Sequence, residues 1–231
     1  MANFFRMLLG ISLLPACWGF ALAFFDALLA SAGASGWVSA EAVSLLGGIL
    51  AFALSWMMVP HPVKTYVLGH ELTHAIWGLV FGARVSELKV GSSGGSVKLT
   101  KSNFIITLAP YFFPFYTFIV IIAALVSYAF FRPLPFLPLW MFMIGFTWAF
   151  HVLFTLETLS RRQPDIREYG RAFSWAVIFI VNVAMVLLWL AATTQLTFAR
   201  LGAILAERGI GAYTQTFSAF RRLWIWAAGM F

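Results

Sequence analysis

The sequence predicts an all-α polytopic membrane protein with about six transmembrane helices and one small membrane-associated β-hairpin. The first observation is composition: of 231 residues, 62% are hydrophobic and only 10% are charged. Soluble domains are roughly 45–50% apolar and about 25% charged. The chain therefore lacks the polar side chains that would cover a water-facing surface. The second observation is the spacing of long apolar runs, and the third is one short polar segment with a strand-like pattern.

Six apolar stretches approach or exceed the roughly 20 residues that a transmembrane helix needs. They are residues 8–30, 42–59, 63–82, 104–131, 139–156 and 173–192. Proline removes an amide donor and disturbs a helix, so Pro110 and Pro114 are expected to kink the fourth stretch.

Residues 83–102 have a different pattern, because apolar residues are interspersed with polar ones on either side of a glycine-rich turn that includes Gly94 and Gly95. This pattern predicts a β-hairpin. The chain then divides into two N-terminal helices (1–62), a core (63–192) and an amphipathic or interfacial C-terminal tail (193–231).

The formal net charge is +7. Nucleic acid is not expected as a partner, because most of the chain is too apolar to lie in water, and excess Lys and Arg in a membrane protein usually set its orientation. Basic residues concentrate in the hairpin 83–102 and in the loop 160–171. The positive-inside rule therefore predicts a multi-pass protein of the cell (inner) membrane with both segments cytoplasmic.

The most informative motif is His70-Glu71-Leu72-Thr73-His74. Residues four apart share one helix face, so His70 and His74 can bind one metal ion while Glu71 serves as a general base beside it. Ionisable groups are costly inside an apolar span, which makes a functional role more plausible than chance. The single cysteine, Cys17, excludes a cysteine-rich metal site.

A catalytic zinc usually has three protein ligands. The residues alone leave Asp165, Glu157 and His151 as candidates for the third, whereas His61 is expected on the far side of the membrane from the hairpin.

The order of these features resembles the site-2 protease family of intramembrane zinc metalloproteases, as a divergent, minimal member without a PDZ domain. The resemblance covers roughly residues 63–192. It rests on three segments in addition to the hairpin: Gly69-His70-Glu71-Leu72-Thr73-His74-Ala75, Leu108-Ala109-Pro110 and Pro164-Asp165. In that family an aspartate near the end of the last core helix is the third ligand, which implies Asp165. Gln163-Pro164-Asp165-Ile166 departs from the family's Asn-Pro…Asp-Gly pattern.

The resemblance implies one Zn²⁺ per chain and hydrolysis of peptide bonds by a zinc-activated water, with Glu71 as general base. The expected partners are the lipid bilayer and a membrane-spanning or membrane-anchored protein or peptide substrate. Gly94, Gly95 and Gln163 are the predicted substrate contacts, since an unpaired hairpin edge can accept an extended peptide. The alternative is a non-proteolytic metal-binding membrane protein with a structural or transport role, which would not need Glu71.

Overall fold

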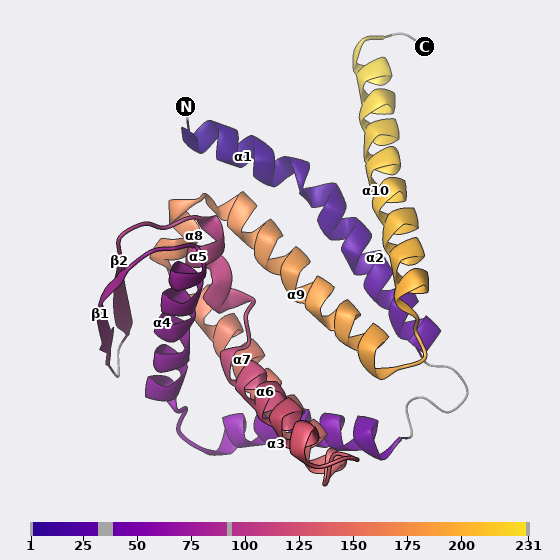
Figure 1. The fold of residues 1–231 in the computed structure, drawn as a ribbon. Helices are drawn as coiled ribbons and strands as arrows, with labels where there is room; N and C mark the ends of the chain where they lie inside the picture. Colours follow the sequence, from indigo (N-terminus) through magenta and orange to yellow (C-terminus); the bar gives the residue numbers. More distant parts are fainter. Residues whose placement is uncertain (1, 32–38, 92–93, 230–231) are drawn as a thin grey trace. The chain divides into compact units, whose positions relative to one another are not determined.

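The computed structural model describes residues 2–31, 39–91 and 94–229 and shows a helical chain with one small β-sheet (Figure 1). The elements are α1 (Ala2–Ser12), α2 (Leu14–Ser31), α3 (Ala40–Met58), α4 (Val63–Val80), β1 (Val85–Val90), β2 (Gly95–Leu99), α5 (Phe104–Leu108), η1 (Ala109–Tyr111), α6 (Phe115–Phe130), α7 (Leu137–Ser160), α8 (Pro164–Glu168), α9 (Arg171–Thr193) and α10 (Phe198–Ala227).

The chain forms two compact units. One comprises Met1–Gly36 and Ile166–Phe231, and the other comprises Trp37–Asp165. The histidine motif, the hairpin and Asp165 all belong to the second unit, so the candidate site can be described within it.

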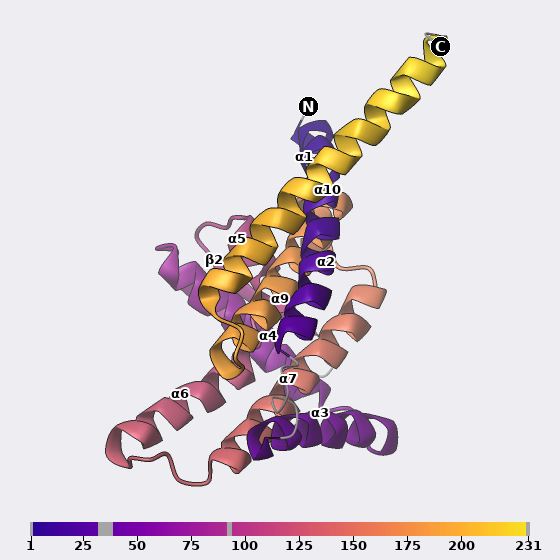
Figure 2. The ribbon, with the colours of Figure 1, turned by 90° about the vertical axis from the view of Figure 1, so that its right-hand side faces the viewer.

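In the first unit, α2 packs against both α9 and α10, and α1 packs against α9. Small residues permit these close contacts: a Cβ on Gly10 would lie 2.5 Å from the Phe173 backbone nitrogen. Asp26 on α2 forms an ion pair with Arg208 on α10, which compensates an acid placed within an apolar helix. The C-terminal half of α10 extends away from the other helices of this unit (Figure 2).

In the second unit, α3 packs along α7 through a reciprocal glycine contact. A Cβ on Gly48 would lie 2.0 Å from the carbonyl oxygen of Phe142, and a Cβ on Gly145 would lie 2.1 Å from that of Leu45. Small residues allow the backbones of membrane helices to come close together, and here each of the two helices contributes one glycine to the contact.

The predicted hairpin is confirmed. β1 and β2 pair antiparallel, with Leu88 opposite Val97 and Val90 opposite Gly95, and the register shifts between Val85 and Glu87. The two strands contact α4, and Figure 1 shows the hairpin beside that helix.

The predicted kink in the fourth apolar stretch is also confirmed. The segment Phe104–Tyr111 meets the helix Phe115–Phe130 at an angle of 82°. Pro110 lies within η1 and Pro114 is the residue before α6, so the bend occurs where the prolines interrupt backbone hydrogen bonding.

The prediction of six spans is wrong. Four helical segments of the described chain are long and apolar enough to cross a membrane: Phe4–Ser31, Ala40–Met58, Leu137–Ser160 and Arg171–Thr193. The bent pair adds a fifth if it counts as one span. The predicted span 63–82 corresponds to α4, which is not among them because Lys64 and the three ionisable residues of the histidine motif reduce its hydropathy.

Candidate metal centre

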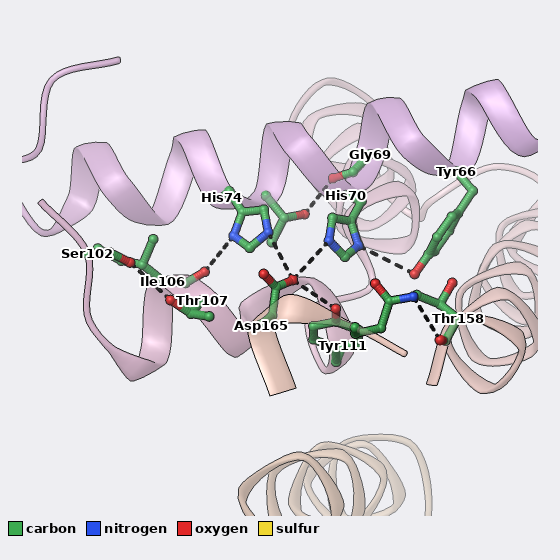
Figure 3. A network of polar contacts seen from close by, with 12 residues as sticks. Tyr66, Gly69, His70, His74, Ser102, Ile106, Thr107, Tyr111, Thr158 and Asp165 are labelled. Atoms are coloured by element: carbon green, nitrogen blue, oxygen red, sulfur yellow. Dashed lines mark hydrogen bonds and ion pairs between the residues drawn. The ribbon is translucent and has the colours of Figure 1, made fainter. Parts of the chain in front are cut away.

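His70 and His74 present their imidazoles on one face of α4. Their ring centroids are 4.9 Å apart, and each side chain is only 12% exposed to solvent. In both rings Nε2 lies 3.7 Å from the same atom, Oδ2 of Asp165 (Figure 3). The spacing of one helical turn therefore brings two imidazole nitrogens and one carboxylate oxygen together.

Asp165 lies in the short helix α8, directly after Pro164, and its carboxylate points toward α4 (Figure 3). The hydroxyl of the fully buried Tyr111 donates a hydrogen bond of 2.8 Å to Oδ2. Burial alone would raise the pKa of this carboxyl. The neighbouring imidazoles of His70 and His74, together with Tyr111, outweigh burial and hold the pKa of Asp165 below its usual range. Asp165 is therefore ionised at neutral pH.

A second set of contacts orients the histidines. Nδ1 of His74 lies 2.8 Å from the carbonyl oxygen of Ile106, to which it donates a hydrogen bond if Nε2 is left free to bind a metal. That carbonyl is itself positioned because the Asn103 side chain caps α5 through the Ile106 amide. Nδ1 of His70 faces the Tyr66 hydroxyl at 3.4 Å, which is longer than an ordinary hydrogen bond.

The three donor atoms fit a metal ion. One ligand atom from each of His70, His74 and Asp165 lies within 4.8 Å of the others, so the group could hold a metal. Ligands at zinc bond lengths of 2.0–2.1 Å in a tetrahedron lie roughly 3.3 Å apart, so the two observed nitrogen–oxygen distances of 3.7 Å require only a small contraction. Two imidazoles and one carboxylate are a donor set found in catalytic zinc sites.

Glu71 is nearly buried beside this group, with 8% of its surface exposed, and interacts electrostatically with His74 and Asp165. The hairpin approaches it closely. A Cβ on Gly95 would lie 2.7 Å from Cγ of Glu71 and 2.8 Å from Cγ1 of Val67. Gly94 has a φ of +150°, a conformation that favours glycine. Glycine is therefore favoured at the two positions for different reasons. Gly94 adopts a backbone conformation that other residues rarely adopt, and Gly95 allows the hairpin to approach Glu71 of α4 closely.

The other candidates for the third ligand lie elsewhere. Glu157 is paired with Arg161 and lies 3.6 Å from Nδ1 of His61. His61 itself stacks on Trp56 with ring centroids 3.6 Å apart. His151 is buried in α7, outside the group of three.

The remaining predicted contact, Gln163, donates its amide N–H to the carbonyl oxygen of Thr158 at 3.0 Å. Sequence reasoning missed Tyr111 as a partner of Asp165. A tyrosine within an apolar stretch carries no motif of its own, and only its nearness to Pro110 placed it at the expected bend.

Comparison with known protein families, with curated protein sequences and with solved structures finds no match to this chain.

Proposed function

We propose that the chain is an intramembrane zinc metalloendopeptidase that cleaves membrane-spanning or membrane-anchored substrates and carries one Zn²⁺ per chain. The observation that carries this proposal is the convergence of His70 and His74 of α4 with Asp165 of α8, with Glu71 next to His70 on α4. A metal site for storage or structure would need the three ligands alone. The additional acid supports hydrolysis, because hydrolysis needs a base next to the attacking water.

In this proposal His70, His74 and Asp165 hold the metal. When bound, the metal supplies Lewis acidity, which activates water and polarises the scissile carbonyl. Glu71 accepts the proton of the attacking water and returns it to the leaving nitrogen of the substrate. With 8% of its surface exposed, Glu71 is largely shielded from bulk water.

The hairpin is the proposed substrate-binding element. A transmembrane helix hides its carbonyls in its own hydrogen bonds, so a scissile segment must unwind first. β1 and β2 pair only with each other in the part of the chain that the structure describes, so each strand has an edge available for an extended peptide. Gly95 brings this hairpin against Glu71, so a peptide added at the hairpin would lie near the proposed base.

The same proposal places the protein in the cell membrane with the hairpin 83–102 and the loop 160–171 cytoplasmic. If the bent pair counts as one span, it and α7 cross the membrane twice between these segments, which puts both on one side. Both segments are rich in Lys and Arg, which favours the cytoplasmic side.

The experiment compares purified wild-type protein with Glu71→Gln for metal content, and cells expressing either form for new membrane-protein termini by mass spectrometry. Glu71→Gln is expected to retain one zinc per chain and to produce none of the cleavage products. A matched pair tests the third ligand: Asp165→Asn should lose zinc, whereas Glu157→Gln should keep it.

Two results would overturn the proposal. Products that persist unchanged in Glu71→Gln would exclude this residue as the base. A wild-type protein that binds zinc but yields no products that depend on Glu71 would favour the non-proteolytic metal-binding alternative.

A further inference from the structure

A small cavity lies beside His70, between α4, the η1–α6 corner and α7. Its volume is about 20 Å³, and its walls include Tyr66, Thr73, Phe150 and His151 in addition to His70. A cavity needs roughly 10–15 Å³ to hold one water molecule. This cavity is therefore large enough for one water and too small for a peptide side chain of ordinary size.

His151 lines this cavity from α7 and is the polar group there that most needs a partner. Only 7% of the residue is exposed, and its Nε2 has no hydrogen-bond partner among the described residues. A buried polar atom without a partner is costly, and native structures usually satisfy such atoms with protein groups or ordered water.

His70 lines the same cavity and also has an incomplete hydrogen bond. Among the described residues, its Nδ1 has only the 3.4 Å approach to the hydroxyl of Tyr66, a residue that also lines the cavity. A histidine that binds a metal normally donates its second N–H to a firm acceptor, as His74 can do to Ile106 at 2.8 Å. Of the two histidines in the motif, His70 is therefore the one with the weaker support.

The cavity is also separate from the side of α4 where hydrolysis is proposed. Successive residues of an α-helix are rotated by about 100°. Gly69 and Thr73, which line the cavity, therefore lie on one side of His70, and Glu71 lies on the other. A water in the cavity would not be the attacking water.

We propose that the cavity holds one ordered water molecule that hydrogen-bonds Nε2 of His151 and completes the support of His70 together with Tyr66. Three polar groups then converge on one water, within the two to four partners that buried waters usually have. His151 is thus a positioning residue, which acts on the metal through the water and His70. The inference rests on the proposed role of His70 as a metal ligand, and it requires no proteolytic activity.

The first test is zinc affinity, measured by competition with a chelating dye on purified protein in detergent. His151→Phe fills the cavity and removes the polar atom, and it is expected to raise the zinc Kd at least 10-fold, because loss of a partner behind a ligand typically costs 10–100-fold. His151→Gln keeps a polar group and should stay within about 3-fold of wild type.

Two controls separate this effect from packing and from the loss of a histidine as such. Phe150→Leu alters the wall of the same cavity without removing a polar group, and His61→Gln removes a histidine outside it. Neither is expected to change the Kd. A Co²⁺-loaded protein supplies a spectroscopic check: His151→Phe should alter the visible absorption of the metal, and both controls should leave it unchanged.

The second test is an experimental map of the wild-type protein at a resolution that shows ordered water. Density for one water within hydrogen-bond distance of His151 Nε2 supports the proposal. Because this test uses the wild-type protein, it does not depend on whether His151→Phe folds. An empty cavity, a direct protein partner for Nε2, or equal zinc affinity in His151→Phe and wild type would overturn it. A wild-type protein that binds no zinc would refute the metal centre, whereas the map would still decide on the water.

Discussion

Replacing Gly95 with alanine tests whether the hairpin is packed directly against Glu71. The new Cβ would lie 2.7 Å from Cγ of Glu71 and 2.7 Å from the backbone oxygen of Lys89. Nonbonded carbon atoms prefer about 3.5–4.0 Å, so the overlap with Glu71 is about 0.8 Å or more. Because one of the two contacts is with backbone, a side-chain rotation alone cannot relieve it, and either β1 or α4 must move.

Such overpacking typically costs about 1–3 kcal/mol of stability. The expected loss of activity is larger, because a displacement of about 1 Å in a catalytic group can lower the rate about 100-fold. Zinc content should not change, since neither Gly95 nor Glu71 belongs to the three-residue group. Gly95→Ala should therefore give a less stable protein that still binds zinc and cleaves poorly.

The assay compares Gly95→Ala with wild type in thermal unfolding, zinc content and formation of the cleavage products. Ser96→Ala, the exposed neighbour in the same strand, is the matched control and should behave as wild type. Wild-type stability and cleavage in Gly95→Ala would refute the packing of the hairpin on Glu71.

Three further predictions address the metal and the packing. Tyr111→Phe removes the hydroxyl that donates to Asp165 and should raise the zinc Kd by about 10-fold or more, as measured by competition titration. Because the pKa of Asp165 is lowered, this ligand stays ionised in mild acid, so zinc loss on acidification should follow protonation of the two imidazoles. Zinc affinity should then fall on acidification with two protons per zinc, and uptake of a third proton, that of Asp165, would contradict this assignment. Gly48→Ala would place Cβ 2.0 Å from a backbone oxygen of α7 and should destabilise the protein by about 1–3 kcal/mol or more, whereas Gly47→Ala meets its nearest neighbour at 3.8 Å and should be tolerated.

Local patterns predicted the elements around the site. The spacing of His70 and His74 predicted a shared helix face, and the alternating segment before and after Gly94 predicted a hairpin. Asp165 was singled out by the resemblance, and the structure brings it to both imidazoles although it lies more than 90 residues away in sequence. The count of spans failed at α4, because the ionisable groups that mark the site also make that helix less apolar.

Tertiary contacts could not be predicted from these patterns. Nothing in the sequence around Tyr111 distinguishes it from a packing residue of an apolar helix, and the sequence marked His151 only as a candidate ligand, not as a neighbour of His70. Their importance depends on which atoms face Asp165 and the cavity, which is set by the 82° bend and by the packing of α6 and α7. His61 lies outside the three-residue group, but its contact with Glu157 near the end of α7 does not fit the reason given for excluding it, a place on the opposite side from the hairpin and the loop 160–171.

X-ray absorption of the purified wild-type protein at the zinc edge tests the proposed metal centre. One zinc per chain is expected, bound by two imidazole nitrogens at about 2.0–2.1 Å and by a carboxylate oxygen at a similar distance. The imidazole signal should fall in His74→Ala, and the occupancy should fall in Asp165→Asn. Absence of stoichiometric zinc, or an unchanged zinc spectrum after loss of His74, would contradict a metal centre at His70, His74 and Asp165.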